Sequence, residues 1–185
     1  MAIKTFTTGE VLTAADTNTY LANSGLVFIK QQTIGSGVSS ISVTSAFSTD
    51  YDNYRIIISK TTVSSIGNSA YITISGSSGS TYSSSGIYMT PTSGTVNGLA
   101  LNQLTTGFWL GITGGVWSGS FDVISPFLGS VTNFFGQSGG SGGSAYYNTT
   151  MSADSNAASS TGFTVVQLSA NFTGGIITVF GYRKS

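Results

Sequence analysis

Charged side chains are scarce in this chain, and their scarcity limits both what it can fold into and what it can bind. Lys and Arg together number 6 of 185 residues, as do Asp and Glu, so 6% of the chain is charged, against roughly 25% in an average soluble domain. Ser, Thr and Gly are abundant instead, with 32, 26 and 25 residues. We therefore expect one domain whose surface polarity comes from hydroxyl and amide groups, as on a particle surface or a carbohydrate-facing surface.

Two residue types with special chemistry are missing altogether. The chain contains no cysteine and no histidine, which excludes disulfides, thiolate nucleophiles and metal sites built from Cys or His. No imidazole can act as a general base, so neither a Ser-His-Asp nor a Cys-His arrangement is available. The formal net charge of zero disfavours binding to nucleic acid or to an anionic membrane. We expect a protein that is not an enzyme and that needs no cofactor and no metal.

The chain nevertheless has the material for a folded core. Hydrophobic residues make up 39% and aromatic residues 12%, whereas disordered chains are rich in charge and poor in aromatic side chains. No apolar run approaches the roughly 20 residues of a membrane span, so we expect no membrane insertion. The start of the chain, Met1–Phe6, lacks the apolar stretch of a secretion signal, which favours synthesis in a cytoplasm.

The first 24 residues differ in pattern from the rest. Thr13 followed by Asp16 is typical of a helix start, with Thr13 as the N-cap and the Asp16 carboxylate near the positive end of the helix. The spacing of apolar residues predicts a helix over Ala14–Ala22. A helix of this length is too short to be stable alone in water. Residues 1–24 must therefore dock on the rest of the domain, on a sister subunit or on another protein.

From Leu26 onward, apolar residues tend to recur at every second position, as in half-buried strands. The pattern predicts strands over 38–47, 54–60, 70–75, 86–90, 96–102, 108–112, 116–125, 131–136, 145–152, 163–170 and 175–183. The last two carry apolar residues on both faces, which favours central strands that are covered on both sides. We interpret the Gly-Ser tract at 139–144 as a mobile surface loop. Many short strands with frequent turns indicate a β-sandwich or a β-barrel.

Three segments resemble recurrent pieces of tailed-bacteriophage virion proteins, in particular small tail-fibre and receptor-binding proteins. They are Phe6–Asn18 near the start, Tyr51–Ile58 in the middle and Gly174–Arg183 at the end. The resemblance implies a virion structural role, a β-sandwich head, a short N-terminal attachment segment and assembly as a homotrimer. It transfers no catalytic residue.

Residues and resemblance together predict an all-β protein, an antiparallel and jelly-roll-like β-sandwich over 25–185, preceded by a helical attachment segment over 1–24. The hypothesis is a tail-fibre or receptor-binding component of the virion, made in the host cytoplasm. Its partners are other virion proteins, further copies of itself in a homotrimer, and a host-surface glycan. Alternatives are a capsid decoration or head-fibre protein and a free carbohydrate-binding module. The residues expected to form the virion attachment are Phe6, Val11, Leu12, Tyr20 and Leu21.

Tyr146, Tyr147 and Asn148 follow the Gly-Ser tract and are the candidates for glycan contact. Aromatic rings stack on the C–H faces of sugars, and amides form hydrogen bonds with sugar hydroxyls. The simpler interpretation is that the two tyrosines alternate along a strand, one in the core and one outside. Other large aromatic residues, among them Trp109 and Trp117, are expected in the core rather than on a binding platform.

Asp50 and Asp52 flank Tyr51 ahead of a predicted strand, and three interpretations are open. Clustered carboxylates could form half of a calcium site, although the spacing of an EF-hand loop is not met. They could also be glycosidase carboxylates, but adjacent turn positions aim poorly at one sugar. Asp and Asn favour turns on their own account, and this third interpretation is the one we prefer.

Overall fold

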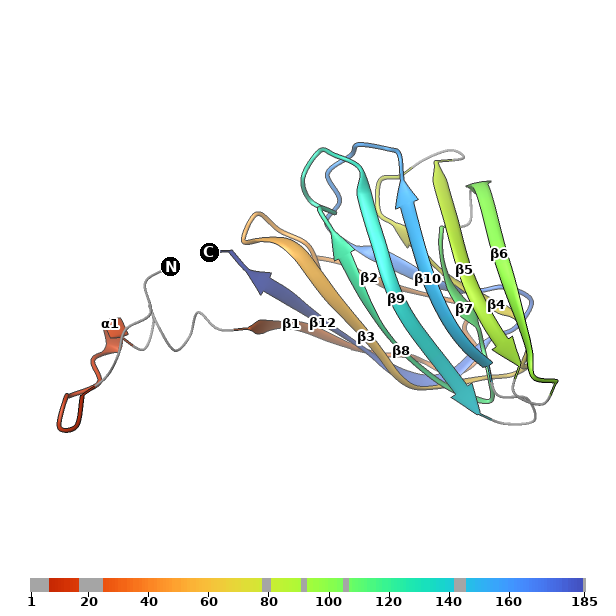
Figure 1. The fold of residues 1–185 in the computed structure, drawn as a ribbon, viewed down its shortest axis with the longest axis horizontal. Coiled ribbons are helices and arrows are strands. Elements are labelled where there is room, and N and C mark those ends of the chain that lie inside the picture. Colours follow the sequence, from red (N-terminus) through yellow and green to blue (C-terminus); the bar gives the residue numbers. More distant parts are fainter. Residues whose placement is uncertain are drawn as a thin grey trace.

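The computed structural model describes residues 7–16, 25–77, 81–90, 93–104, 107–141 and 146–184. Within these ranges the regular structure is almost entirely antiparallel β-sheet, as Figure 1 shows, and the helical part is the short element α1 (Ala14–Asp16). The twelve strands are β1 (Leu26–Thr33), β2 (Ser40–Val43), β3 (Tyr51–Val63), β4 (Ser69–Ile74), β5 (Tyr82–Thr90), β6 (Thr95–Leu104), β7 (Phe108–Ile112), β8 (Val116–Ile124), β9 (Thr132–Ser141), β10 (Tyr146–Asp154), β11 (Phe163–Gln167) and β12 (Phe172–Arg183). No helix in the same ranges has the length and apolar character needed to span a membrane.

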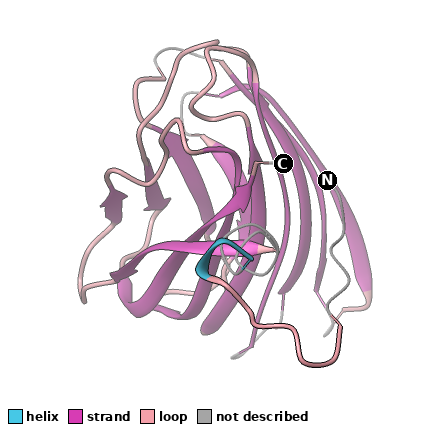
Figure 2. Cartoon of the chain, turned by 90° about the vertical axis from the view of Figure 1, so that its left-hand side faces the viewer, coloured by secondary structure: helices cyan, strands magenta, loops and turns pink. Residues whose placement is uncertain are grey.

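The strands form two sheets packed against each other (Figure 2). The large sheet has the order β1-β12-β3-β8-β9-β10-β5-β6, and the small sheet has the order β2-β11-β4-β7. Buried side chains from both sheets make one hydrophobic cluster. The predicted all-β, sandwich-like architecture is therefore confirmed, because each sheet buries the alternate apolar residues of its strands against the other.

Eight of the strands are paired in a nested way. β1 pairs with β12, β2 with β11, β3 with β8 and β4 with β7, all antiparallel, so the second half of the chain returns beside the first. Successive pairs alternate between the large and the small sheet. The other four strands form two hairpins, β5–β6 between β4 and β7, and β9–β10 between β8 and β11. Both hairpins extend the large sheet beyond β8.

Aromatic rings fill the centre of the core. Phe121, Phe134 and Phe108 form a stack that crosses from the large sheet to the small one, with ring centroids 5.2 and 5.1 Å apart. Trp109 and Trp117 are fully buried as well, which confirms that the large aromatic residues belong to the core. Offset ring pairs at this spacing add to the stabilisation that burial alone gives.

Each segment predicted as a strand overlaps one in the structure, but several details differ. β1 was not predicted, because a bulge between Phe28 and Lys30 interrupts its alternation. The Gly-Ser tract is a loop only in part, since β9 continues to Ser141 and pairs Gly139 and Gly140 with β10. Residues 142–145 lie outside the described ranges. β11 and β12 are central strands, as predicted, because each lies between two neighbours in its sheet. They are not covered on both sides, because their outward-facing residues are half buried or exposed.

The N-terminal segment stands apart from the sheets (Figure 1). Its predicted capping pair is present, since the Asp16 N–H donates to Thr13 Oγ1 at 3.1 Å and the Thr13 N–H donates to Asp16 Oδ2 at 3.2 Å. The described helix ends at Asp16. The rest of the helix predicted over Ala14–Ala22 lies outside the described residues.

Two neighbouring phenylalanines test the inner and outer faces of β9. Phe134 is fully buried, whereas Phe135 is 39% exposed on the other face. We expect Phe134→Ala to lower the free energy of unfolding by about 3–5 kcal/mol, because it removes the middle ring of the aromatic stack and leaves a cavity. Phe135→Ala should cost much less. Urea unfolding measures both, and equal costs would contradict this assignment of the faces.

Candidate binding face

The free edge of β7 is closed by side chains of the large sheet. β7 is the last strand of the small sheet, so one row of its backbone groups has no neighbouring strand. Ser84 Oγ accepts from the Trp109 N–H at 3.1 Å, and Ser138 Oγ donates to the Leu110 carbonyl at 2.8 Å. These contacts satisfy backbone groups that would otherwise be buried without a partner.

Asn148 completes this closure and is not exposed. Its Oδ1 accepts from the Ile112 N–H at 3.0 Å, and its Nδ2 donates to the Ile112 carbonyl at 3.2 Å and to Ser138 Oγ at 3.0 Å. The side chain is only 3% exposed. Gly111, with φ of +121°, leaves room for the amide, because a Cβ there would lie 2.4 Å from Asn148 Cγ. The prediction that Asn148 contacts a glycan is therefore wrong, since its amide is engaged inside the fold.

The alternate residues of β10 point the other way and form part of an open face. Tyr147 is 54% and Met151 57% exposed, with Thr149 exposed between them. Tyr147 is thus the outward residue of the candidate trio, and the side chain of Tyr146 lies outside the described residues. Ile87 on β5 and Phe135 on β9 are exposed on the same face. We call the outward surface of β5, β6, β9 and β10 the outer face.

The outer face is hollowed. One depression of about 490 Å³ lies across β5, β6, β9 and β10. Its lining includes the larger side chains Asn102, Asn133, Phe135 and Met151 and the small side chains Ser83, Ser85, Ala100 and Ala153. Three further depressions of about 450, 370 and 380 Å³ share residues such as Met151 and Thr149 with it or with one another. The hollows arise because small residues stand between large ones on neighbouring strands.

The half of the protein that carries this face has almost no charge. The sequence has no charged residue from Thr61 to Phe121, and none from Val123 to Ala153. The one acid of the two inserted hairpins, Asp154, is 1% exposed and accepts a hydrogen bond from the Asn156 N–H at 3.0 Å. The outer face of the hairpins therefore offers hydroxyls, amides and apolar groups, and its described residues include no exposed ionic group.

A charged cluster marks the border of the uncharged region. The Arg55 guanidinium donates twice to the Asp122 carboxylate, both times at 2.8 Å, and the Tyr182 hydroxyl donates to the same carboxylate at 2.5 Å. Partial burial alone would raise the pKa of Asp122, but the hydrogen bonds from Arg55 and Tyr182 outweigh it and hold that pKa below its ordinary value. Burial and the contact with Asp122 raise the pKa of Tyr182 to about 12. The cluster joins β3, β8 and β12 and borders one of the hollows.

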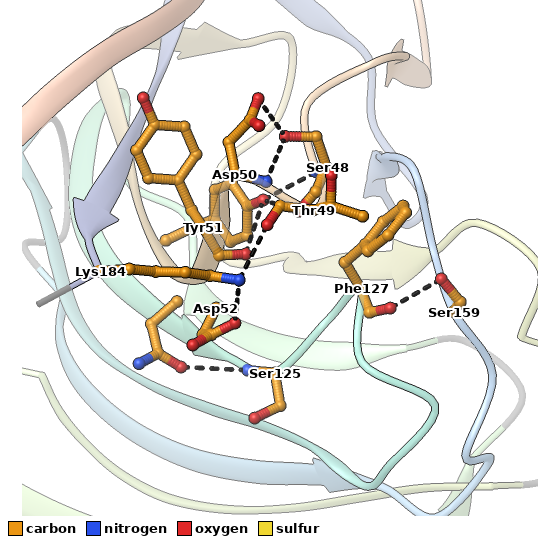
Figure 3. A network of polar contacts seen from close by, with 11 residues as sticks. Ser48, Thr49, Asp50, Tyr51, Asp52, Ser125, Phe127, Ser159 and Lys184 are labelled. Atoms are coloured by element: carbon orange, nitrogen blue, oxygen red, sulfur yellow. Dashed lines mark hydrogen bonds and ion pairs between the residues drawn. The ribbon is translucent and has the colours of Figure 1, made fainter.

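The turn with Asp50 and Asp52 holds the C-terminal end of the chain (Figure 3). Lys184 Nζ lies 2.7 Å from Asp52 Oδ1 and donates to the Thr49 carbonyl at 2.8 Å. Asp50 bonds with the Ser48 hydroxyl within the turn. Within the described ranges no three Asp, Glu, His or Cys side chains gather as a metal site would require. The contacts of Asp50 fit the turn interpretation, whereas Asp52 is the second residue of β3 and forms an ion pair with Lys184.

The residues expected at the virion attachment are only partly described. Val11 is 79% and Leu12 49% exposed, and neither is covered by the sheets. Phe6, Tyr20 and Leu21 lie outside the described residues.

Comparison with known proteins gives no relative, since no family model, no curated protein and no solved structure matches the chain.

Asn148 can be tested against its neighbours on the same strand. Asn148→Ala should destabilise the fold by roughly 1–3 kcal/mol for each buried backbone group of Ile112 that loses its partner. Thr149→Ala, on the opposite face, should change the free energy of unfolding by less than about 0.5 kcal/mol. Urea unfolding at neutral pH measures both. An Asn148→Ala variant as stable as the parent would contradict the role of the amide in closing β7.

The raised pKa values of tyrosines in the folded protein predict how the free energy of unfolding changes at alkaline pH. Stability should stay nearly constant between roughly pH 5 and 9, because the chain has no histidine and few acids. The pKa of Tyr182 is raised from 10.0 to about 12 in the folded state, and burial also raises the pKa values of Tyr54 and Tyr82. Above pH 10 the unfolded chain loses these protons first, so stability should fall as the pH rises toward 12.

Urea midpoints from pH 5 to 11 measure this effect. Tyr182→Phe should make the alkaline fall shallower, whatever its effect at pH 7, because one group with a raised pKa is removed. A steep loss of stability near pH 6 would instead reveal a buried carboxylate with a raised pKa.

Proposed function

We propose that this chain is a virion structural protein of a tailed bacteriophage, a tail-fibre or receptor-binding component. In this proposal the N-terminal segment joins the particle, and the β-sandwich head meets the host surface.

The observation that carries the proposal is the nested pairing of eight strands. Without the two inserted hairpins, four strands remain in each sheet, in the orders β1-β12-β3-β8 and β2-β11-β4-β7. A long hairpin whose successive pairs alternate between two sheets has the topology of a jelly roll, and we assign the fold to that class. Jelly rolls are used in viral capsid and lectin domains. Fold alone does not fix function, so the surface has to agree with the assignment.

The outer face agrees with contact to a neutral carbohydrate. Uncharged sugars present hydroxyls and C–H faces, and the outer face offers Gln137 and Asn133 as amide partners beside the exposed rings of Tyr147 and Phe135. Its depressions share lining residues with one another, as a site for an extended chain of sugars requires. The absence of exposed ionic groups from this face avoids the cost of desolvating charges against a neutral ligand.

The N-terminal segment agrees with attachment to a particle. Residues 7–15 are all exposed, and apolar Val11 and Leu12 are among them. Apolar side chains on a segment apart from the core gain stability when a second surface covers them. That surface would be another virion protein or a sister subunit.

Truncation tests the attachment role. A chain of residues 25–185 should be soluble and retain the β-sheet spectrum of the parent, yet it should no longer join particles when supplied in place of the full chain. The measurement is circular dichroism together with immunogold electron microscopy of purified particles. Truncated protein on the particles would remove the basis for the proposal, as would a truncated chain that fails to fold while the full chain folds alone as a monomer.

A glycan array tests the outer face. The full chain should bind neutral glycans, and Tyr147→Ala should weaken that binding without loss of stability. The control is Val131→Ala, whose side chain is 45% exposed and lines none of the hollows described above. Equal weakening by both variants would count against the outer face as the glycan site.

The same fold also allows a capsid decoration or head-fibre protein, because jelly rolls form capsid domains. Gold label on the capsid rather than on the tail in the same micrographs would favour this second function.

A further inference from the structure

Three of the four sheet edges are protected against pairing with another chain. The small sheet ends at β7, which side chains close, and at β2, which has only four residues. The large sheet ends at β1, where the bulge after Phe28 and the charge of Lys30 interrupt the edge. Charged residues, bulges, short strands and covering groups are the usual means by which edges avoid pairing.

The fourth edge, β6, has none of these protections from Thr95 to Leu101; beyond that stretch, a register shift against β5 places an extra residue between Leu101 and Leu104. It is ten residues long, Thr95–Leu104, and contains neither a charged residue nor a proline. Val96 and Ala100 point to the outer face, and Leu99 and Leu101 point to the other face. A strand with apolar residues on both faces is typical of a sheet interior. Yet residues 95–102 are all exposed or half buried.

We propose that β6 pairs antiparallel with β6 of a second copy of this chain, so that the two large sheets form one continuous sheet. This inference does not depend on the proposed function, and it differs from the homotrimer that the resemblance to phage fibre proteins implies. The partner is a second copy because the uncharged half carries β6, and two identical charge-free edges meet without like-charge repulsion. The unpaired backbone groups of one edge then satisfy those of the other.

The register of such a pair is narrowly limited. Residues directly opposite in a sheet lie on the same face, and side chains alternate between faces. A two-fold axis must therefore pass between two identical residues. Within the regular stretch Thr95–Leu101, pairing is longest when Gly98 faces Gly98. The two copies of Gly98 then lie directly opposite, with Cβ positions about 4.5–5.5 Å apart, and a Cβ at Gly98 would meet no other atom within 4 Å in the single chain.

The test uses the full chain in sedimentation velocity at micromolar concentrations and 0.15 M salt. The parent should sediment as a dimer of the 19.0 kDa chain. Gly98→Lys should weaken association at least about tenfold, because it brings like charges together across the axis. The matched control is Ala157→Lys, at an exposed position in the loop before β11, and it should remain dimeric. Urea unfolding of each variant establishes that it is folded.

Mixing two variants tests the pairing itself. Gly98→Lys and Gly98→Glu should each be largely monomeric alone, and an equimolar mixture should restore the dimer through opposite charges. Amide hydrogen exchange in residues 95–104 should slow in the mixture and in the parent. A monomeric parent would overturn the proposal. So would a trimer, or a dimer that Gly98→Lys leaves intact, and so would a mixture that stays monomeric.

Discussion

The closure of β7 by side chains is the constraint on which much of this architecture depends. An edge strand buried inside a sandwich needs partners for its backbone groups, and β7 finds them in Ser84, Ser138 and Asn148 rather than in another strand. These three come from β5, β9 and β10. The inserted hairpins must therefore lie over β7, and the large sheet must extend beyond the small one. The inner face of the hairpins is polar because the backbone groups of β7 need these hydrogen-bond partners.

Charge is distributed in a way that matches this division. Lys30, Arg55 and Lys184 lie on or beside β1, β3 and β12, where an ion pair at 2.8 Å and another at 2.7 Å join β3 to its surroundings. The hairpin half has no exposed ionic group among its described residues. Exposed ion pairs contribute little to stability, so stability does not account for the asymmetry. An uncharged surface favours a neutral ligand or an identical surface.

Alternation along the sequence was enough to find most strands, because their inner residues are apolar; the strand over 108–112 was predicted to the residue. Prediction from alternation failed where polar residues face the interior of the protein. Asn148 looked like a surface amide, since nothing local indicates that Ile112, far away in sequence, needs its hydrogen bonds. β1 was not predicted because its bulge shifts the alternation of inward and outward residues. The order in which the strands pair, and therefore the nested topology, depends on contacts between residues far apart in the sequence. Neither the alternation of apolar residues nor the composition reveals these contacts.

In the proposed function, the two hairpins separate recognition from stability. The eight nested strands supply most of the aromatic and aliphatic core, whereas the hairpins contribute Phe134 and Tyr82 to it and mostly hydroxyls and amides elsewhere on their inner faces. On β10 the exposed residues alternate with the buried ones, so Tyr147 and Met151 can change without disturbing Asn148 or Ser152 on the other face. Selection for a new ligand can therefore act on the outer face while the hydrogen bonds that close β7 stay in place. The large sheet ends at β6, in the hairpin β5–β6. In the proposed dimer, a change that protects this edge would weaken association and leave the nested core intact.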